Sequence, residues 1–153
     1  MHYDLLIVGG GPGGVAAGVY ASRKRLKTLL ITESFGGQSV VSEDIQNWIG
    51  TPHINGGVWA DSLKNHLKEY TSDIVDIKEG QRVSKIEKNG TLFKVTTESG
   101  EIFETKTVLI TSGSSRRKLE VPGAEKYEHK GLTYCAPCDG PLFTDQDTVV
   151  IGG

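Results

Sequence analysis

The chain has little cysteine, no excess of positive charge and no long apolar run, and each absence excludes a class of protein. Only two cysteines occur in 153 residues, too few for the disulfide framework of a secreted domain of this size. Acidic residues number 19 against 17 basic ones, and no basic stripe is present, so we expect no nucleic-acid partner. No apolar run approaches the roughly 20 residues that cross a bilayer, and the N-terminus has no secretory signal pattern. We therefore expect a cytoplasmic chain without membrane association.

The remaining composition is that of a globular protein. Hydrophobic residues make up 37% of the chain and charged residues 24%, a balance typical of folded soluble domains. Glycines are abundant and cluster at 9–14, 36–37, 56–57 and 152–153, between periodic segments rather than in a low-complexity tract. The length suffices for one ordinary domain with a sizeable core.

The beginning of the chain predicts a β-α-β unit. Residues 3–11 have the pattern of a buried strand that runs into a glycine loop. Residues 12–25 predict a helix, with Pro12 just inside its start and basic residues in its last turn. Residues 27–33 form a second apolar run. The two strands should be parallel, with a right-handed connection.

The rest of the chain predicts an α/β domain that contains a β-meander. Apolar positions at helical spacing indicate an amphipathic helix over 58–70. Alternating runs over 73–106 are joined by Asn-Gly and Ser-Gly dipeptides, which favour two-residue hairpin turns. Continuous apolar runs at 107–113 and 147–153 predict two further buried strands, the first of them a central parallel strand.

A glycine motif, Gly9-x-Gly11-x-x-Gly14, lies between the first strand and the helix. In a dinucleotide-binding fold, Gly9 permits the tight turn, Gly11 lets the backbone approach a pyrophosphate, and Gly14 lets the helix pack closely on the strand. The pyrophosphate then meets the helix N-terminus, where free N–H groups favour anions. Glu33, at the end of the next apolar run, can accept hydrogen bonds from ribose hydroxyls. The motif predicts a bound dinucleotide, FAD or NAD; an unrelated glycine-rich turn is the alternative.

Both cysteines lie in one motif, Cys135-x-x-Cys138. Neighbouring thiols can close a disulfide and stabilise each other's thiolate, which favours a redox dithiol. A zinc site would need two more ligands at suitable spacing, which the chain does not offer, so we expect no metal. A pair of inert buried thiols is the remaining alternative. Asp139 follows directly, either as a cap or turn residue or as a proton donor and acceptor for the departing thiolate.

The last residues repeat the pattern of the first strand. VVIGG at 149–153 has the same order of apolar residues and glycines as LLIVGG at 5–10. We therefore expect a second dinucleotide fold to begin at Thr148, and we interpret the chain as the first part of a longer protein.

Several segments together resemble the low-molecular-weight thioredoxin reductase family, to which the flavoprotein subunit of alkyl hydroperoxide reductase is closely related. Besides the β-α-β unit, they are FGGQ at 35–38, IQNWIG at 45–50, LITSGSSRRKLEVPGAEKY at 109–127 and KGLTYCAPCDGPLF at 130–143. The resemblance implies an FAD-dependent disulfide reductase driven by NADPH. The alkyl hydroperoxide reductase flavoprotein normally has an extra region ahead of this core, whereas here Tyr3 begins the flavin strand, which favours thioredoxin reductase.

The resemblance assigns particular residues to FAD. The first glycine motif and Glu33 would bind its ADP half, the FGGQ and QNWIG segments would line the flavin, and a Thr-x-Gly stretch would pass close to the cofactor. Ser112 within that stretch and Ser114 after it depart from the small apolar residues expected there. The implied cofactor-binding residues are Gly9, Gly11, Pro12, Gly13, Gly14, Glu33, Gly37, Gln38, Asn47, Thr111 and Gly113.

The resemblance also implies an electron path. NADPH would reduce FAD, and the electrons would pass to the disulfide between Cys135 and Cys138. Cys138 would face the flavin, Cys135 would exchange with the disulfide of thioredoxin or a similar small dithiol protein, and Asp139 would be the acid. A homodimer is the assembly that the resemblance implies.

The fold that these patterns predict is a Rossmann-like FAD-binding fold with a β-meander insertion, followed by the truncated start of a second, NADPH-binding Rossmann-like domain. Residues 1–114 would form the FAD-binding domain without its closing segment. Residues 115–153 would hold a linker, the C-x-x-C region and the first strand of the NADPH-binding domain. The closing segment of the FAD-binding domain and the rest of the NADPH-binding domain would both follow Gly153. The alternative function is therefore a flavin-binding or interaction module without turnover.

Overall fold

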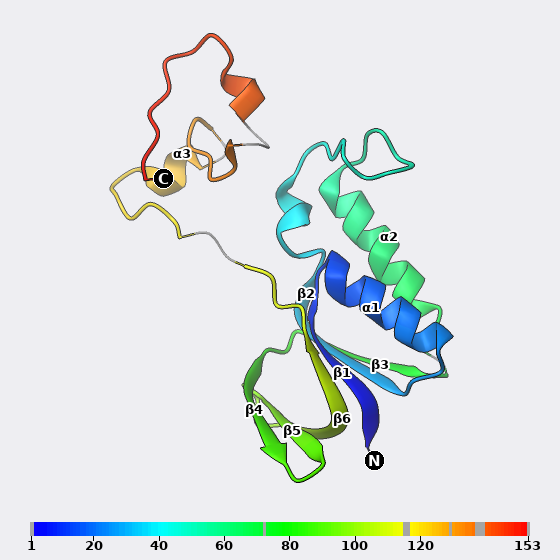
Figure 1. Cartoon of the computed structure of the whole chain (residues 1–153). Coiled ribbons are helices and arrows are strands. Elements are labelled where there is room, and N and C mark those ends of the chain that lie inside the picture. The colour runs from blue at the N-terminus through cyan, green and yellow to red at the C-terminus, as the bar shows by residue number, and fades with distance from the viewer. Residues whose placement is uncertain (1, 72, 115–116, 129, 137–139, 153) are drawn as a thin grey trace. The chain divides into compact units, whose positions relative to one another are not determined.

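The computed structural model describes residues 2–71, 73–114, 117–128, 130–136 and 140–152. The chain divides into two compact units, Met1–Ser114 and Ser115–Gly153. The first unit holds the sheet and two long helices, and the second contains only short helical turns and extended segments among its described residues (Figure 1).

The first unit contains one six-stranded sheet. Its strands are β1 (Tyr3–Gly10), β2 (Thr28–Phe35), β3 (Val75–Glu79), β4 (Val83–Asn89), β5 (Leu92–Thr97) and β6 (Ile102–Ile110). Their order across the sheet is β3-β2-β1-β6-β5-β4. β3, β2, β1 and β6 are parallel neighbours, whereas β4, β5 and β6 pair antiparallel as a meander. The carboxyl ends of β1, β2 and β6 therefore meet at one edge of the sheet, where ligands bind in open α/β folds.

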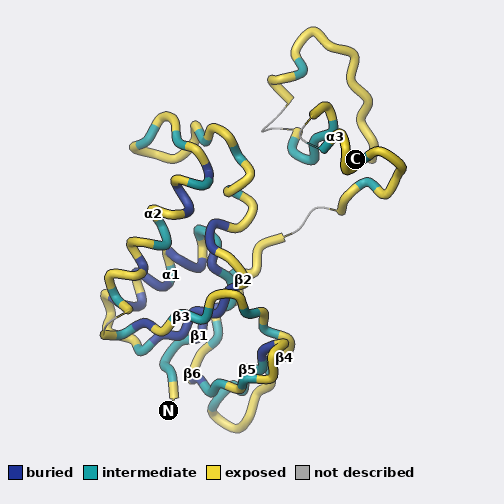
Figure 2. Tube along the Cα trace, turned by 180° about the vertical axis from the view of Figure 1, so that it is seen from behind, coloured by how far each residue is buried: buried dark blue, intermediate teal, exposed yellow. Residues whose placement is uncertain are grey.

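Two cores lie on opposite faces of the parallel strands. Successive side chains of a strand point to opposite faces, so Ile7 packs toward α1 (Pro12–Arg23) and α2 (Gly56–Lys68), and Leu6 packs toward the meander. Both helices lie on one side of the sheet (Figure 1), and buried residues are most frequent in β2 and α1, with further ones in α2 and β1 (Figure 2). The helix-side core contains Ile7, Val15, Val19, Leu30, Phe35, Leu67 and Val75. The meander-side core contains Leu6, Leu29, Ile31 and Val95.

The predicted β-α-β unit, amphipathic helix and meander are present, with three differences in detail. Residues expected in two separate segments form the single strand β6, which pairs with β5 through its first half and with β1 through its second. β3, expected to belong to the meander, pairs parallel with β2 instead. α2 begins at Gly56, two residues before the predicted start, because the Asn55 side chain accepts hydrogen bonds from the N–H groups of Gly57 (2.9 Å) and Val58 (3.3 Å).

The second unit is held together by local contacts around α3 (Ala124–Tyr127). Lys118 Nζ lies 2.8 Å from a Glu128 carboxylate oxygen, and the Leu119 N–H donates to the Tyr134 hydroxyl at 2.9 Å. A 3₁₀ turn, η2 (Gly140–Phe143), follows the C-x-x-C region.

The strand expected at 147–153 is not formed over residues 147–152, so this part of the prediction is wrong. Val149 and Val150 are 88% and 86% exposed. A parallel strand needs a neighbouring strand to receive its backbone hydrogen bonds, and the described residues of the second unit include no strand for it to join. The apolar pattern alone therefore does not produce a strand here.

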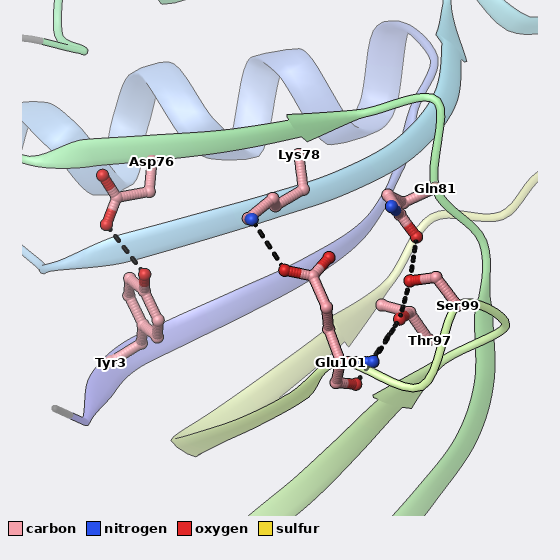
Figure 3. Close-up of polar contacts among 7 residues, drawn as sticks. All are labelled: Tyr3, Asp76, Lys78, Gln81, Thr97, Ser99 and Glu101. Atoms are coloured by element: carbon pink, nitrogen blue, oxygen red, sulfur yellow. Dashed lines mark hydrogen bonds and ion pairs between the residues drawn. The ribbon is translucent and has the colours of Figure 1, made fainter.

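Polar side chains join β3, at the edge of the sheet, to β1 and to the turn between β5 and β6 (Figure 3). Lys78 Nζ lies 2.8 Å from a Glu101 carboxylate oxygen, and the Ser99 hydroxyl donates to the Gln81 side-chain oxygen at 2.8 Å. On β1, the Tyr3 hydroxyl donates to Asp76 at 2.8 Å. These contacts tie β3 and the β3–β4 connection to β1 and to the β5–β6 turn.

The Tyr3 hydroxyl is expected to ionise at a higher pH than an ordinary tyrosine. Partial burial, the hydrogen bond to Asp76 and the negative charge of Asp76 together raise the pKa of Tyr3 to about 12. Because the folded state holds this proton more tightly than the unfolded state, the stabilisation is complete below about pH 10 and is lost as the pH rises through about 12. In an absorbance titration of tyrosinate, the component that ionises near pH 12 should disappear in Tyr3→Phe. Tyr20→Phe, at a side chain 70% exposed, should retain it; a Tyr3→Phe titration identical to wild type would contradict the assignment.

Candidate functional site

The glycine loop forms where β1 passes into α1. Gly9 has a φ of 110° and lies against the end of β6: a Cβ on Gly9 would sit 2.3 Å from the Thr111 carbonyl oxygen. A Cβ on Gly14 would lie 1.9 Å from the Gly9 carbonyl oxygen. Both positions therefore require glycine, one for its backbone conformation and contact and the other for the close packing of α1 on the loop.

Gly11 differs from both. It is the N-cap of α1, with φ −71° and ψ −177°, a backbone that any residue can adopt. A Cβ there would meet no atom within 4 Å. No side chain caps this helix, whose first residue is Pro12, so the N–H groups of Gly13 and Gly14 begin α1 without a capping side chain. The geometry leaves Gly11 and the start of α1 open to an anionic group such as a pyrophosphate.

The end of β2 borders the same loop. The Gly10 N–H donates to the Thr32 hydroxyl at 2.9 Å, and the Gly36 N–H donates to the Gly10 carbonyl at 3.0 Å. Gly36 and Gly37 have φ values of 87° and 56°, and a Cβ on Gly37 would lie 3.6 Å from the Gly11 Cα. Gly37 of the FGGQ segment thus forms one wall of the open space at Gly11.

Thr111, directly after β6, hydrogen-bonds to the end of β1 and to the glycine loop. Its N–H donates to the Val8 carbonyl at 2.8 Å, and its hydroxyl lies 3.0 Å from the Val8 carbonyl oxygen and 3.1 Å from that of Gly9. Gly113 follows in an exposed position with a φ of 66°. The structure therefore brings the glycine loop, Gly37 and Thr111 together at the carboxyl edge of the sheet.

Glu33 lies in β2, which continues two residues past it to Phe35. Its carboxylate is exposed and forms an ion pair with Arg82, with 2.5 Å between Glu33 Oε2 and Arg82 Nη2. In a ribose-binding role the carboxylate would share its oxygens between this guanidinium and the sugar hydroxyls.

Gln38 and Asn47 are exposed, and among the described residues neither donates or accepts a hydrogen bond at the glycine loop. Gln38 is in a 3₁₀ turn, η1 (Gly37–Val41). Asn47 is in a loop closed by a bridge between Ile45 and Ile54. The rings of Trp48 and Trp59 pack 4.9 Å apart, centroid to centroid, and so connect this loop to α2.

The predicted dithiol belongs to the second unit. Cys135 is half-buried and disulfide-bonded, and its N–H donates to the Thr133 hydroxyl at 3.3 Å. Cys138 and Asp139, the other two predicted catalytic residues, lie outside the described residues. The described residues contain no group of three or more His, Cys, Asp or Glu side chains placed to hold a metal ion, and none of their helices is long and apolar enough to span a membrane.

Sequence reasoning missed Thr32 and Arg82. Thr32 supplies the acceptor for Gly10, and its hydroxyl-bearing side chain directly before Glu33, the acid expected to bind ribose, was a usable signal for it. Arg82 follows β3 and meets Glu33 only because β3 pairs beside β2. No local sequence pattern predicts that contact, because 48 residues lie between Glu33 and Arg82 in the sequence.

Comparison with known proteins gives consistent results. Residues 3–153 match the family model described as pyridine nucleotide-disulphide oxidoreductase. The chain is 40% identical over 151 residues to the alkyl hydroperoxide reductase F protein of Escherichia coli K12, and also 40% identical to an NADH dehydrogenase of Bacillus subtilis 168. Each match covers 99% of this chain but 29% of the relative.

Solved structures extend the comparison to the fold. The thioredoxin reductase of Streptococcus pyogenes MGAS5005 matches with a TM-score of 0.82 and 39% identity, over 94% of this chain and 46% of that one. The Lactococcus lactis thioredoxin reductase in its FR conformation matches with a TM-score of 0.74 and 37% identity, over 92% and 45%. The expected Rossmann-like α/β fold and the resemblance to the thioredoxin reductase group are confirmed. The chain spans less than half the length of each of these proteins. It is a member of the pyridine nucleotide-disulphide oxidoreductase family.

Proposed function

We propose that this chain carries the FAD-binding and dithiol portion of an NADPH-dependent disulfide reductase that acts on thioredoxin or a similar small dithiol protein. The observation that supports it most directly is the open space at Gly11, bordered by Gly37 and by the uncapped start of α1. A cytoplasmic location and a homodimer belong to the same proposal. Residues 1–114 would be its FAD-binding domain, and residues 115–153 would begin its NADPH-binding domain.

In this proposal the glycine loop holds the two phosphates of FAD. The N–H groups of Gly13 and Gly14 would point at the phosphate oxygens from the positive end of the α1 dipole. Glu33 would accept hydrogen bonds from the ribose hydroxyls. The remaining cofactor-binding positions, Gly9, Pro12, Gly37, Gln38, Asn47, Thr111 and Gly113, would shape the loop and border the flavin.

The dithiol would perform the exchange with the substrate. Two electrons and two protons convert the disulfide of Cys135 and Cys138 to two thiols. The Cys135 thiolate then attacks the substrate disulfide and forms a mixed disulfide, and Asp139 gives a proton to the departing thiolate. The Cys138 thiolate attacks Cys135, which restores the protein disulfide and releases the substrate as a dithiol. Bound flavin would supply the two-electron carrier between nicotinamide and the disulfide.

NADPH is the proposed electron donor, and the similarity to an NADH dehydrogenase of Bacillus subtilis makes NADH the competitor to test. The visible absorption spectrum of the purified chain, before and after each nucleotide is added anaerobically, tests the proposal. We expect flavin bands, and bleaching of those bands by NADPH would support nicotinamide-driven turnover by the chain itself. A yellow protein that neither nucleotide bleaches would be a flavin-binding module without turnover, and a colourless protein that takes up no added FAD would contradict the proposed function.

A second candidate is the core of an alkyl hydroperoxide reductase flavoprotein, favoured by the 40% identity to the Escherichia coli alkyl hydroperoxide reductase F protein. The two candidates differ in their dithiol partner. Reduction of thioredoxin supports the first, and reduction restricted to the partner disulfide of a peroxidase system supports the second.

A further inference from the structure

The ion pair between Arg82 and Glu33 lies beside the glycine loop, and the proposed binding residues do not account for Arg82. Arg82 Nη2 lies 2.5 Å from Glu33 Oε2. Among the described residues no other side chain bonds to the Glu33 carboxylate, so Oε1 keeps its full capacity to accept hydrogen bonds. Glu33 is on the same strand as Thr32, whose hydroxyl accepts from Gly10 of the loop.

The backbone around Arg82 is held in place from two sides. The Gly80 N–H donates to the Glu33 carbonyl at 3.2 Å, and the Gln81 N–H donates to the Thr32 carbonyl at 3.1 Å. On the other side, the Glu98 N–H donates to the Arg82 carbonyl at 2.9 Å. The guanidinium therefore projects from a backbone tied both to β2 and to the meander, which restricts where it can reach.

Side-chain contacts of Gln81, the residue before Arg82, further restrain this segment of the backbone. The Gln81 side chain accepts from Ser99 at 2.8 Å, and Ser99 lies 2.9 Å, oxygen to oxygen, from Thr97 (Figure 3). The Thr97 hydroxyl also accepts from the Glu101 N–H at 3.1 Å. The segment that carries Arg82 is thus linked to the β5–β6 turn as well as to β2.

We infer that Arg82 is a positioning residue: by holding Glu33 Oε2, it orients the carboxylate so that Oε1 receives the ribose hydroxyls of the ADP half of FAD. This inference rests on the proposed function, because it requires that a nucleotide bind at the glycine loop. A carboxylate already held in one rotamer loses less conformational freedom when the sugar binds, so the affinity for the nucleotide rises.

An exposed ion pair by itself contributes little to stability, and the two side chains here are each 60% exposed. A purely structural role would therefore leave nucleotide binding unchanged. The chain offers a matched control in the ion pair between Arg25 and Asp73, whose side chains are 67% and 56% exposed. Arg25 lies before the amino end of β2, at the opposite end of that strand from Glu33.

The test is the affinity of the chain for FAD, for ADP and for 2′,3′-dideoxy-ADP, measured by calorimetric titration. We expect Arg82→Met to weaken FAD and ADP binding about three- to tenfold, Arg82→Lys to weaken it less, and Arg25→Met to leave it unchanged. The affinity for 2′,3′-dideoxy-ADP should be the same in wild type and Arg82→Met, because that ligand has no hydroxyls for Glu33 to accept from. Thermal unfolding of each variant checks that the fold is retained.

The outcomes separate the two claims. Wild-type binding of FAD together with an unchanged Arg82→Met affinity overturns the role of Arg82 and leaves the proposed function standing. An equal loss of ADP and 2′,3′-dideoxy-ADP affinity also overturns it, because the effect would then not act through the ribose hydroxyls. A wild-type chain that binds neither FAD nor ADP overturns both claims.

Discussion

Replacement of Gly14 by alanine is expected to destabilise the first unit by about 3 kcal/mol and to abolish FAD binding. Alanine is the better helix former by up to about 1 kcal/mol, but the new methyl group would lie 1.9 Å from the Gly9 carbonyl oxygen, a backbone atom that cannot rotate away. α1 would have to move off the loop. The change in the free energy of unfolding, measured by denaturant titration, checks the size of the effect.

Gly11→Ala is the matched comparison within the same loop. Its backbone is extended and its Cβ would meet no atom within 4 Å, so the stability of the chain without cofactor should be unchanged. The affinity for FAD should nevertheless fall by about tenfold or more, because the methyl group occupies the space through which the pyrophosphate approaches. If Gly11→Ala binds FAD as wild type does, the open space at Gly11 is not the phosphate site.

Substitution of each cysteine in turn is expected to separate the attack on the substrate disulfide from the resolution of the mixed disulfide. When the reduced chain is mixed with oxidised thioredoxin, wild type should release reduced thioredoxin. Cys138→Ser should stop at a covalent one-to-one complex, because Cys135 can attack but nothing resolves the mixed disulfide. Cys135→Ser should form no such complex. Non-reducing electrophoresis and mass spectrometry read out the three results.

The opposite pattern would reverse the assignment of roles. A complex trapped by Cys135→Ser and not by Cys138→Ser would make Cys138 the residue that attacks the substrate. Wild-type chain that leaves thioredoxin oxidised would remove thioredoxin as the partner, and the peroxidase-system disulfide would then be the substrate to test.

Local sequence patterns were sufficient for the elements that depend on local rules. The β-α-β unit follows from apolar periodicity and from Pro12 at the start of α1. The special geometry of Gly9 and Gly14 follows from their place between a strand and a helix. These features need only neighbouring residues, which is why a single sequence predicts them.

Features that depend on strand pairing could not be predicted in the same way. β6 contains polar residues where its antiparallel half becomes its parallel half, and they suggested a boundary that the pairing with β1 removes. The strand pattern of β3 gave no indication that its partner is β2. Arg82 could not be associated with Glu33 without that partner. The apolar tail at 147–152 has the composition of a strand but no strand beside it among the described residues.

The most direct measurement of the central claim, that one chain couples a flavin to a redox disulfide, is an anaerobic reductive titration of the FAD-loaded chain followed at the flavin absorption band. Flavin and disulfide each take up two electrons, so wild type should consume about four electrons per flavin before bleaching is complete. Cys138→Ser, which has no disulfide to reduce, should consume about two. An uptake of two electrons by the wild-type chain, or a chain that retains no flavin, would contradict the claim.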